Sequence, residues 1–461
     1  METFKKAAGL NQNGEVDPKT FKGILSTDAV VLGSMGDSRI QEIQRGLNSH
    51  YSDCFWIDLN ICPVDGVYGR NTCNAMLYAF QKALGIDEPT GTFGPTTSAL
   101  AGDHNVALWS GQTELVVLLQ YMLYVNGFDP GEFDGGFGYG VEGAVMDFQD
   151  MMALDADGVV GLSTWAALLI SKGNVDRAPN AIDTTARINS NRAQYFKSIG
   201  IDYVGRYLTG YWPITISEIN KILEAGLRYI PIFERSGDDI IGIIPDVTEA
   251  AYFTTSQGTS DAAYAIEVAD RLGLPRSSVI YFAVDFDVYD FEVESHIIPY
   301  FRALKNKLNQ NSDYRVGIYA SRSCCAKVAA AGLSEYSYVA DMSTAFSGNI
   351  GCKMPSNWAF DQYWFDDIGV QSRYMEYDKV IASGRDAGVG SITIPNLPRV
   401  LCTYTLESLG IDTAIGWDYN VEYPFYTGVV DGKYKMGVSG SFSPMVNLGT
   451  LPANQKITLA I

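Results

Sequence analysis

One stretch, Val279–Asp287, constrains the fold of this chain more than any other, because it has the pattern of a buried strand that ends in two acids. Successive side chains of a strand point to opposite faces of its sheet. One face of this strand is apolar throughout, whereas the other starts apolar and ends in Asp285 and Asp287. A strand that is apolar on both faces is typical of a parallel sheet. Acids at its C-terminal end are typical of the rim where α/β barrels carry their chemistry, although the two acids could instead cap the next helix.

The length and charge of the chain limit what it can be. A chain of 461 residues is too long for one ordinary hydrophobic core, so we expect several domains. Its 53 acidic and 33 basic residues give a formal net charge of −20. Nucleic acids and anionic membranes both need a basic surface, so neither is an expected partner. The oligomeric state stays open.

The cysteines and histidines do not favour disulfides or metal chemistry. Seven cysteines, two of them adjacent at Cys324 and Cys325, argue against a regular disulfide framework. The three histidines are widely scattered, so we expect no histidine-based metal centre and no cofactor. Amidase or peptidase chemistry is therefore disfavoured, although Cys324 or Cys325 paired with His296 stays open as a nucleophile and base.

The N-terminal segment indicates where the protein is expected to be located and how it would be exported. Residues Met1–Lys6 lack the long apolar core of a secretory signal, and no apolar run in the chain approaches the length of a membrane span. We expect an extracellular or cell-wall protein that is exported without a classical signal peptide.

The first 170 residues contain an internal repeat. The sequence Asp-Gly-x-aromatic-Gly at 65–69 recurs at 134–138, and each copy is followed by a helical pattern that ends in Phe-Gln. Each copy then closes with a glycine turn and a threonine before a short helix. The opening residues match only the second half of this unit. We therefore predict a partial repeat at 1–30 and whole repeats at 34–102 and 112–172.

These repeats resemble the three-helix peptidoglycan-binding domain found on many cell-wall hydrolases. The resemblance implies that they bind peptidoglycan glycan strands. The second copy departs from the first, since Arg70 has no basic counterpart at the matching place. The alternative is a helical spacer that binds nothing, because a fold does not by itself fix a function.

An α/β pattern follows a polar boundary at 171–180. Strands and helices alternate beyond it, as in a parallel sheet with crossover helices. Helices are predicted at 189–199, 216–225, 259–272, 291–309 and 322–331, and the later intervals are short and loop-like. Strands are predicted at 181–184, 203–208, 228–233, 279–285, 315–319, 338–341, 358–363 and 377–381. Eight strands predict a (β/α)8 TIM barrel at 178–387.

The ends of these predicted strands are rich in acids, aromatics and an amide. A glycosidase needs two carboxyls, one protonated and one ionised, roughly 5–9.5 Å apart, and crowded acids push their pKa values apart. The candidate catalytic residues are Asp183, Glu234, Asp285, Asp287 and Asp378. The candidate substrate-binding residues are Arg206, Tyr207, Tyr319, Asp341, Gln362 and Trp364. Among these, Arg206 could be a salt-bridge partner, Tyr319 and Gln362 could pack the rim, and Asp341 could cap a helix.

Residues 180–383 resemble the glycoside hydrolase family 25 lysozymes and, more closely, the allied glycoside-hydrolase-like barrels of bacteria. The resemblance rests on the motifs at 181–184, 204–207, 230–234, 282–287, 317–321, 361–364 and 377–380. It implies that Asp183, Asp285 and Asp378 take the places of lysozyme-family carboxylates. Asp287 stands where the lysozymes have a proton-donating glutamate, so either Asp287 or Glu234 would be the acid, or the barrel binds glycan without cutting it.

The last segment, 397–461, is predicted to be β-rich, with a hairpin at 429–434 around an Asp-Gly turn. Two functions are compatible with the whole pattern. The first is a muramidase-like cell-wall hydrolase whose helical repeats bind the wall. The second is a non-catalytic peptidoglycan-binding or structural protein of a surface or delivery assembly.

Overall fold

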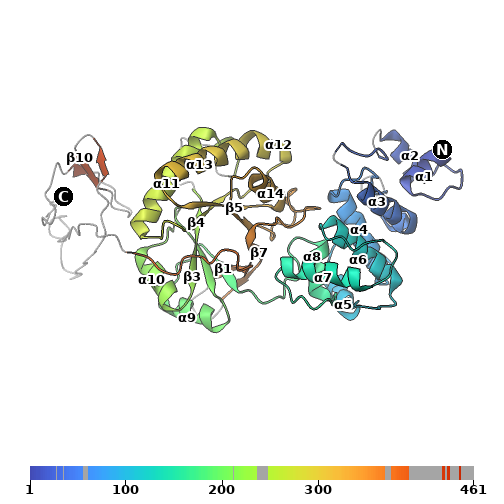
Figure 1. Cartoon of the computed structure of the whole chain (residues 1–461), viewed down its shortest axis with the longest axis horizontal. Coiled ribbons are helices and arrows are strands. Elements are labelled where there is room, and N and C mark those ends of the chain that lie inside the picture. The colour runs from blue at the N-terminus through green and yellow to red at the C-terminus, as the bar shows by residue number, and fades with distance from the viewer. Residues whose placement is uncertain are drawn as a thin grey trace, which may run out of the picture. The chain divides into compact units, whose positions relative to one another are not determined.

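The computed structural model describes most of the first 393 residues. The described residues are 1–26, 29–34, 36–55, 61–210, 212–235, 248–368 and 375–393, with three short strands beyond them. The chain divides into two compact units, one formed by 1–268 and 275–391 and the other by 269–274 and 392–461. The first unit contains a helical region followed by a barrel (Figure 1).

The second unit contains a small sheet of three strands in the order β11-β10-β9. The strands are β9 (Gly428–Val430), β10 (Lys433–Met436) and β11 (Val446–Asn447). β9 pairs antiparallel with β10, with Val430 opposite Lys433, as the predicted hairpin requires. The turn itself, and most of the segment predicted to be β-rich at 397–461, lie outside the described residues.

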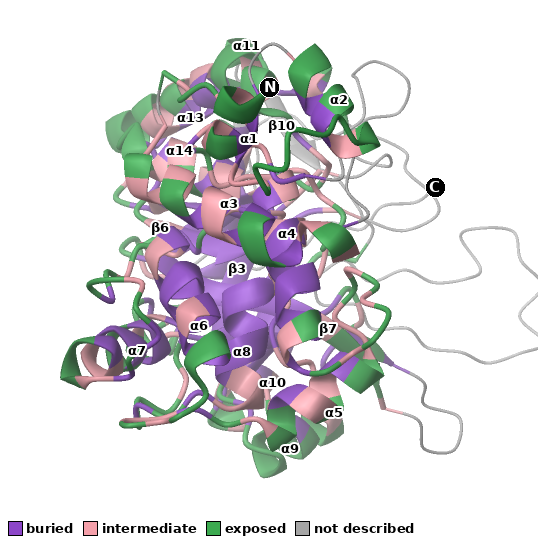
Figure 2. Cartoon of the chain, turned by 90° about the vertical axis from the view of Figure 1, so that its right-hand side faces the viewer, coloured by how far each residue is buried: buried purple, intermediate pink, exposed green. Residues whose placement is uncertain are grey.

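The helical region consists of short helices joined by glycine turns. They are α1 (Glu2–Ala8), α2 (Pro18–Leu25), α3 (Ser38–Tyr51), η1 (Ser52–Cys54), α4 (Arg70–Ala83), α5 (Pro95–Asp103), α6 (Thr113–Val125), α7 (Tyr139–Met151) and α8 (Leu162–Leu169). α3, α4 and α5 correspond to the first predicted whole repeat, and α6, α7 and α8 to the second. α6 and α8 are largely buried, whereas α7 has a buried and an exposed side (Figure 2).

A glutamine of the first helix of each repeat binds the turn that carries the aspartate of the repeated motif. Gln44 Nε2 donates to Asp65 Oδ1 at 2.8 Å, and Gln44 Oε1 accepts from the backbone N–H of Gly66 at 2.8 Å. Gln120 makes the matching bonds to Asp134, at 3.0 Å, and to the N–H of Gly135, at 2.9 Å. Both glutamines are buried, so they satisfy turn groups that have lost contact with water.

A second pair of buried glutamines joins the second and third helices of each repeat. Gln81 donates to Thr97 Oγ1 at 2.9 Å, and Gln149 donates to Thr164 Oγ1 at 3.1 Å. The Phe-Gln and Thr positions of the motif therefore hold the second and third helices of each repeat together. The repeat signature is explained by the internal structure of the helical region.

The barrel closes in the order β1 to β8. Its strands are β1 (Ala181–Asp183), β2 (Tyr203–Tyr207), β3 (Arg228–Phe233), β4 (Val279–Ala283), β5 (Arg315–Ala320), β6 (Tyr336–Val339), β7 (Trp358–Asp367) and β8 (Glu376–Ala382). Its helical elements are α9 (Ser190–Ser198), α10 (Ile216–Glu224), η2 (Ala250–Tyr252), α11 (Thr255–Leu272), α12 (Asp290–Glu292), η3 (Val293–Ile297), α13 (Ile298–Asn311) and α14 (Arg322–Ala330). Each predicted strand overlaps an observed one.

The prediction of a (β/α)8 TIM barrel is nevertheless wrong. β1 to β7 run parallel to their neighbours, but β8 runs antiparallel to both β7 and β1, so the barrel is mixed. Residues 340–357, between β6 and β7, form no helix. A parallel pair needs a crossover of a dozen or more residues, whereas 368–375 between β7 and β8 is short enough only for a hairpin-like return. The connection before β8 is too short for a crossover helix, and the final strand therefore runs antiparallel to its neighbours.

Strand β7 contacts the helical region and the segment that follows it. Trp358 Nε1 donates to the carbonyl of Met151 at 2.8 Å, and Arg177 pairs with Asp361 at 2.6 Å. These contacts join the barrel to the helical region and to the segment between them. In the part of the chain that the structure describes, no helix is both long and apolar enough to cross a membrane.

Candidate active site

Two carboxyl groups face each other where β1 meets β8. Asp183 and Asp378 are direct partners in the antiparallel register of these strands, and their side chains share a hydrogen bond. Gln362 of β7 joins them, because its Nε2 donates to Asp378 Oδ2 at 2.9 Å and to Asp183 Oδ2 at 3.1 Å. The sequence predicted all three residues for this rim, and the structure brings them together.

The pair binds one proton near neutral pH because two adjacent carboxylates cannot both ionise cheaply. Burial, followed by the charge of Asp378, raises the pKa of Asp183 well above its usual range. Burial also raises the pKa of Asp378, to about 6, although its hydrogen bond with Asp183 opposes the rise. Asp183 is therefore the protonated partner that donates to Asp378.

Three tyrosines complete this site. Tyr338 of β6 donates to Asp183 Oδ2 at 2.5 Å, and Tyr319 of β5 donates to Gln362 Oε1 at 2.9 Å. Tyr207, at the end of β2, is half-buried, and burial followed by the charge of Asp183 raises its pKa well above the usual value. All three phenols therefore stay protonated, and those of Tyr338 and Tyr319 donate hydrogen bonds within the site. The sequence analysis missed Tyr338, which the alternation along β6 could have placed on the inner face with the barrel core.

Asp285 lies two residues beyond the end of β4 and belongs to the same site. Its charge raises the pKa of Tyr319 and of Asp378, in both cases after the larger effect of burial. Asp285 keeps solvent access, yet the surrounding protein removes enough hydration to raise its own pKa. We call Asp183, Asp285 and Asp378, with Tyr207, Tyr319, Tyr338 and Gln362, the rim cluster.

The other two candidate acids have different surroundings. Glu234 directly follows β3, and its charge contributes to the raised pKa of Tyr207 after burial and Asp183. Glu234 is therefore near the rim cluster. Asp287 instead binds the loop between β6 and β7, because it accepts from the N–H of Ser347 at 2.6 Å and from Ser347 Oγ at 3.2 Å.

The structure does not bring Arg206 into the rim cluster. Its guanidinium is fully buried and pairs with Glu218 of α10 at 2.8 Å. The remaining nitrogens donate to the carbonyls of Thr184 and Trp212. Arg206 is a salt-bridge partner, as one reading of the sequence allowed, but its partner is a helix residue and not a rim acid.

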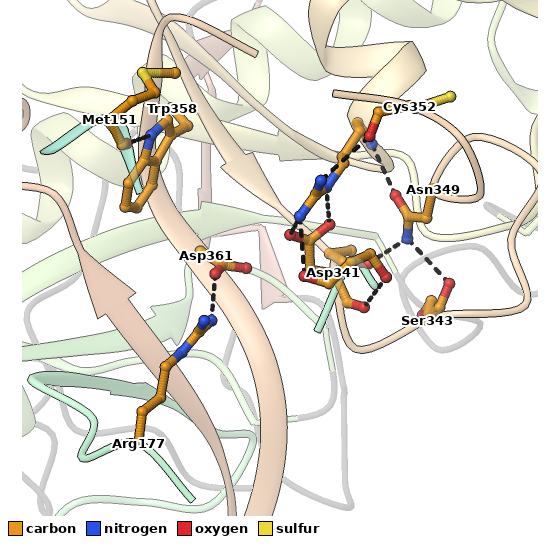
Figure 3. Close-up of polar contacts among 11 residues, drawn as sticks. Met151, Arg177, Asp341, Ser343, Asn349, Cys352, Trp358 and Asp361 are labelled. Carbon is orange, nitrogen blue, oxygen red and sulfur yellow. Dashed lines mark hydrogen bonds and ion pairs between the residues drawn. The ribbon is translucent and has the colours of Figure 1, made fainter. Parts of the chain in front are cut away.

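Asp341 belongs to a second polar network, drawn in Figure 3. It is fully buried and forms a two-pronged pair with Arg322, at 2.7 and 2.5 Å. Burial and the neighbouring Asp341 raise the pKa of Asp361 to about 8, while Arg177 opposes that rise. Asp341 caps no helix and stands apart from the rim cluster. The sequence analysis missed Arg177, Arg322 and Asp361, whose pairing depends on contacts between distant segments.

Trp364 follows an irregularity in the pairing of β7 with β8. It is half-buried, stacks on Phe365 with ring centroids 5.0 Å apart, and lies under the ammonium of Lys172 at 4.4 Å. Such a cation–π contact holds the indole in place. In the described part of the chain, no group of three or more His, Cys, Asp or Glu side chains is arranged to hold a metal ion.

The raised pKa values predict how stability depends on pH. In the unfolded chain both aspartates ionise near pH 4, whereas in the folded protein Asp378 keeps its proton up to about pH 6 and Asp183 to higher pH. Above pH 4 the folded state therefore binds more protons. The contribution of Asp378 to the free energy of unfolding is lost as the pH rises through 6, and that of Asp183 is lost at higher pH. We expect the double variant Asp183→Asn/Asp378→Asn to gain stability relative to the parent between pH 4 and 7. Urea unfolding at a series of pH values measures this, and a constant difference between the two proteins contradicts it.

The comparisons with known proteins define the class of both parts of the first unit. Residues 194–387 match the family model described as Rv2525c-like, glycoside hydrolase-like domain. Residues 33–169 match the model described as FadG/YbfG, PGDB-like domain. The predicted resemblance to glycoside-hydrolase-like barrels is therefore confirmed.

The chain is 41% identical over 418 residues to the uncharacterized protein YbfG of Bacillus subtilis, covering 86% of this chain and 55% of YbfG. It is 36% identical over 397 residues to the uncharacterized protein FadG of the same organism, covering 84% of this chain and 67% of FadG. The chain belongs to the family of FadG and YbfG. Among solved structures it is similar to the Tat-secreted protein Rv2525c of Mycobacterium tuberculosis, with 18% identity and a TM-score of 0.38 over 47% of this chain and 100% of that one.

Proposed function

We propose that the barrel is a muramidase-like glycoside hydrolase that cleaves a glycosidic bond of peptidoglycan, as the family 25 lysozymes do. One observation carries the proposal. The proton-sharing pair Asp183–Asp378 lies beside Asp285, a carboxyl with a raised pKa and solvent access. Glycosidases need one protonated and one ionised carboxyl across the bond that they cut. A glycoside-hydrolase-like domain in this part of the chain supports the same chemistry.

In this proposal Asp285 is the general acid. It is the exposed carboxyl of the rim cluster, and loss of hydration raises its pKa, which favours the protonated form that an acid needs. Asp378 is half-buried and serves as the base or nucleophile on the other side of the bond. Asp183 is almost fully buried, so it acts through Asp378 by holding the shared proton.

The remaining groups of the rim cluster would bind the sugar. Tyr207 is half-buried and stays protonated, so its hydroxyl can donate to a sugar oxygen. Glu234 is near Tyr207 and can accept from a sugar hydroxyl. The helical repeats would hold the polymer, and this partner implies an extracellular or cell-wall location.

Digestion of purified sacculi tests the proposal. The purified chain is incubated with sacculi from several bacteria, and the soluble fraction is analysed by mass spectrometry. We expect muropeptides with new reducing ends. Soluble products without new reducing ends would assign another bond, and the absence of any soluble product would contradict hydrolysis.

A second function, glycan binding without hydrolysis, is favoured by the surroundings of Asp287. This residue stands at the position of the lysozyme proton donor, but its carboxylate accepts two hydrogen bonds from Ser347. If the family's acid is needed at that position, the barrel holds a glycan without cutting it. Saturable sedimentation with sacculi and no release of fragments would support this function.

A further inference from the structure

Each helical repeat has a face formed by the glycine before its second helix and the first residue of that helix. In the first repeat this face is covered by the loop between β6 and β7. A Cβ built on Gly351 would lie 2.6 Å from the backbone carbon of Gly69, so the two backbones touch. Arg70 then donates to Ser347 Oγ at 3.4 Å. The first repeat uses this face to contact the barrel.

In the second repeat the matching face is open and aromatic. Tyr139 takes the place of Arg70 as the first residue of α7 and is 71% exposed. Trp109 lies beside it and is 70% exposed, with the ring centroids 5.6 Å apart and the planes at 78°. An exposed tryptophan and tyrosine at right angles leave apolar ring surface in contact with water, which is typical of a binding site.

The backbone of Trp109 is held in a conformation that bulky residues rarely adopt. Its φ is +63°, and its N–H donates to the carbonyl of Phe137 at 2.9 Å. Such a conformation costs about 1–3 kcal/mol and persists where the surrounding structure imposes it, often at functional sites. Here it presents the indole next to Tyr139 on the surface.

The two segments that carry this pair are themselves uncharged, and the charged residues that flank them, Asp103, Glu114, Asp134 and Glu142, are all acidic. Neither of the segments that carry the pair, 104–113 and 135–141, contains a lysine, arginine, aspartate or glutamate. The first segment supplies neutral polar groups beside the indole, including Ser110 and Gln112. An aromatic pair with neutral hydrogen-bonding groups and only acidic residues at its borders fits an uncharged ligand, and not a nucleic acid or an anionic lipid surface.

We infer that Trp109 and Tyr139 form a stacking platform for a neutral pyranose ring of a glycan. The C–H groups of a sugar ring pack against the negative faces of aromatic rings, and its hydroxyls bond neutral polar groups at the edge. The inference deepens the proposed function, since it takes a glycan as the ligand, but it assigns a second site in the helical region, apart from the rim cluster.

Variants that remove the aromatic rings test the platform in the full chain. Trp109→Asn removes the indole, and asparagine is chosen because it tolerates a positive φ. Tyr139→Ala removes the phenol. The control is Tyr195→Ala, which removes an aromatic ring of α9 in the barrel that is 42% exposed. The probes are N-acetylglucosamine hexamer in calorimetric titration and purified sacculi in sedimentation.

We expect each platform variant to bind about tenfold more weakly, which corresponds to about 1.4 kcal/mol, while Tyr195→Ala binds like the parent. Equal affinity of the platform variants and the parent would overturn the inference. If Trp109→Asn does not fold, as judged by circular dichroism, Tyr139→Ala alone decides, because its side chain is mostly exposed. Muropeptide release from sacculi is measured in parallel. If the chain binds glycan through the platform but releases no fragments, only the proposed hydrolysis is refuted.

Discussion

The Asp285→Asn variant should release muropeptides from sacculi at least about 100-fold more slowly than the parent, because a positioned general acid contributes roughly 10²–10⁴-fold to such reactions. Asparagine keeps the shape of the side chain but has no proton to give to the leaving oxygen. The side chain is exposed, so the melting temperature should stay close to that of the parent. Reducing-end release and thermal unfolding of both proteins measure the two effects.

Two further variants make this test specific. Asp366→Asn makes the same chemical change at an exposed position of β7 and should leave the rate unchanged. Asp287→Asn keeps an oxygen that can accept from Ser347 and should reduce the rate less than Asp285→Asn does. If Asp287→Asn abolishes release while Asp285→Asn does not, the acid is Asp287 and the assignment to Asp285 fails.

The Arg206→Met variant should lose about 3–5 kcal/mol of stability, because removing one member of a buried ion pair leaves the other charge uncompensated. Glu218 would stay between α10 and β2 with only the N–H of Ile188 and the first turn of its own helix nearby. For a domain of this size the loss corresponds to a fall in melting temperature of roughly 6–20 °C. Calorimetry of the full chain measures this shift in the barrel transition.

The double variant Arg206→Met/Glu218→Leu tests whether the lost stability comes from the unpaired charge of Glu218 or from lost packing. It removes both charges and should recover much of the lost stability, since buried ion pairs are often replaceable by apolar groups of similar size. Arg187→Met removes an exposed arginine near the same helix and should change the melting temperature little. A melting temperature of Arg206→Met equal to that of the parent would show that the pair does not hold α10 on the barrel.

The sequence predicted the elements of the barrel well, because the signals for a strand are local. Apolar residues on both faces of Val279–Ala283 mark a buried strand whatever it pairs with, and the polar residues after it mark where it ends. The direction of β8 was not predicted correctly. A strand has the same residue pattern in either direction, and the length of the preceding connection was the only sign of the reversal.

For the candidate site residues, too, some properties follow from local sequence signals and others from contacts between distant segments. The strand pattern was enough to show which carboxylates, tyrosines and amides stand at strand ends. Their partners became known only from the folded chain, in which Asp183 shares its proton with Asp378 and Asp287 binds Ser347. In the same way Arg206 pairs with Glu218, and Asp341 pairs with Arg322. The physical reason is that a strand end depends on neighbours in the chain, whereas a pKa or an ion pair depends on which distant groups are brought within a few ångströms.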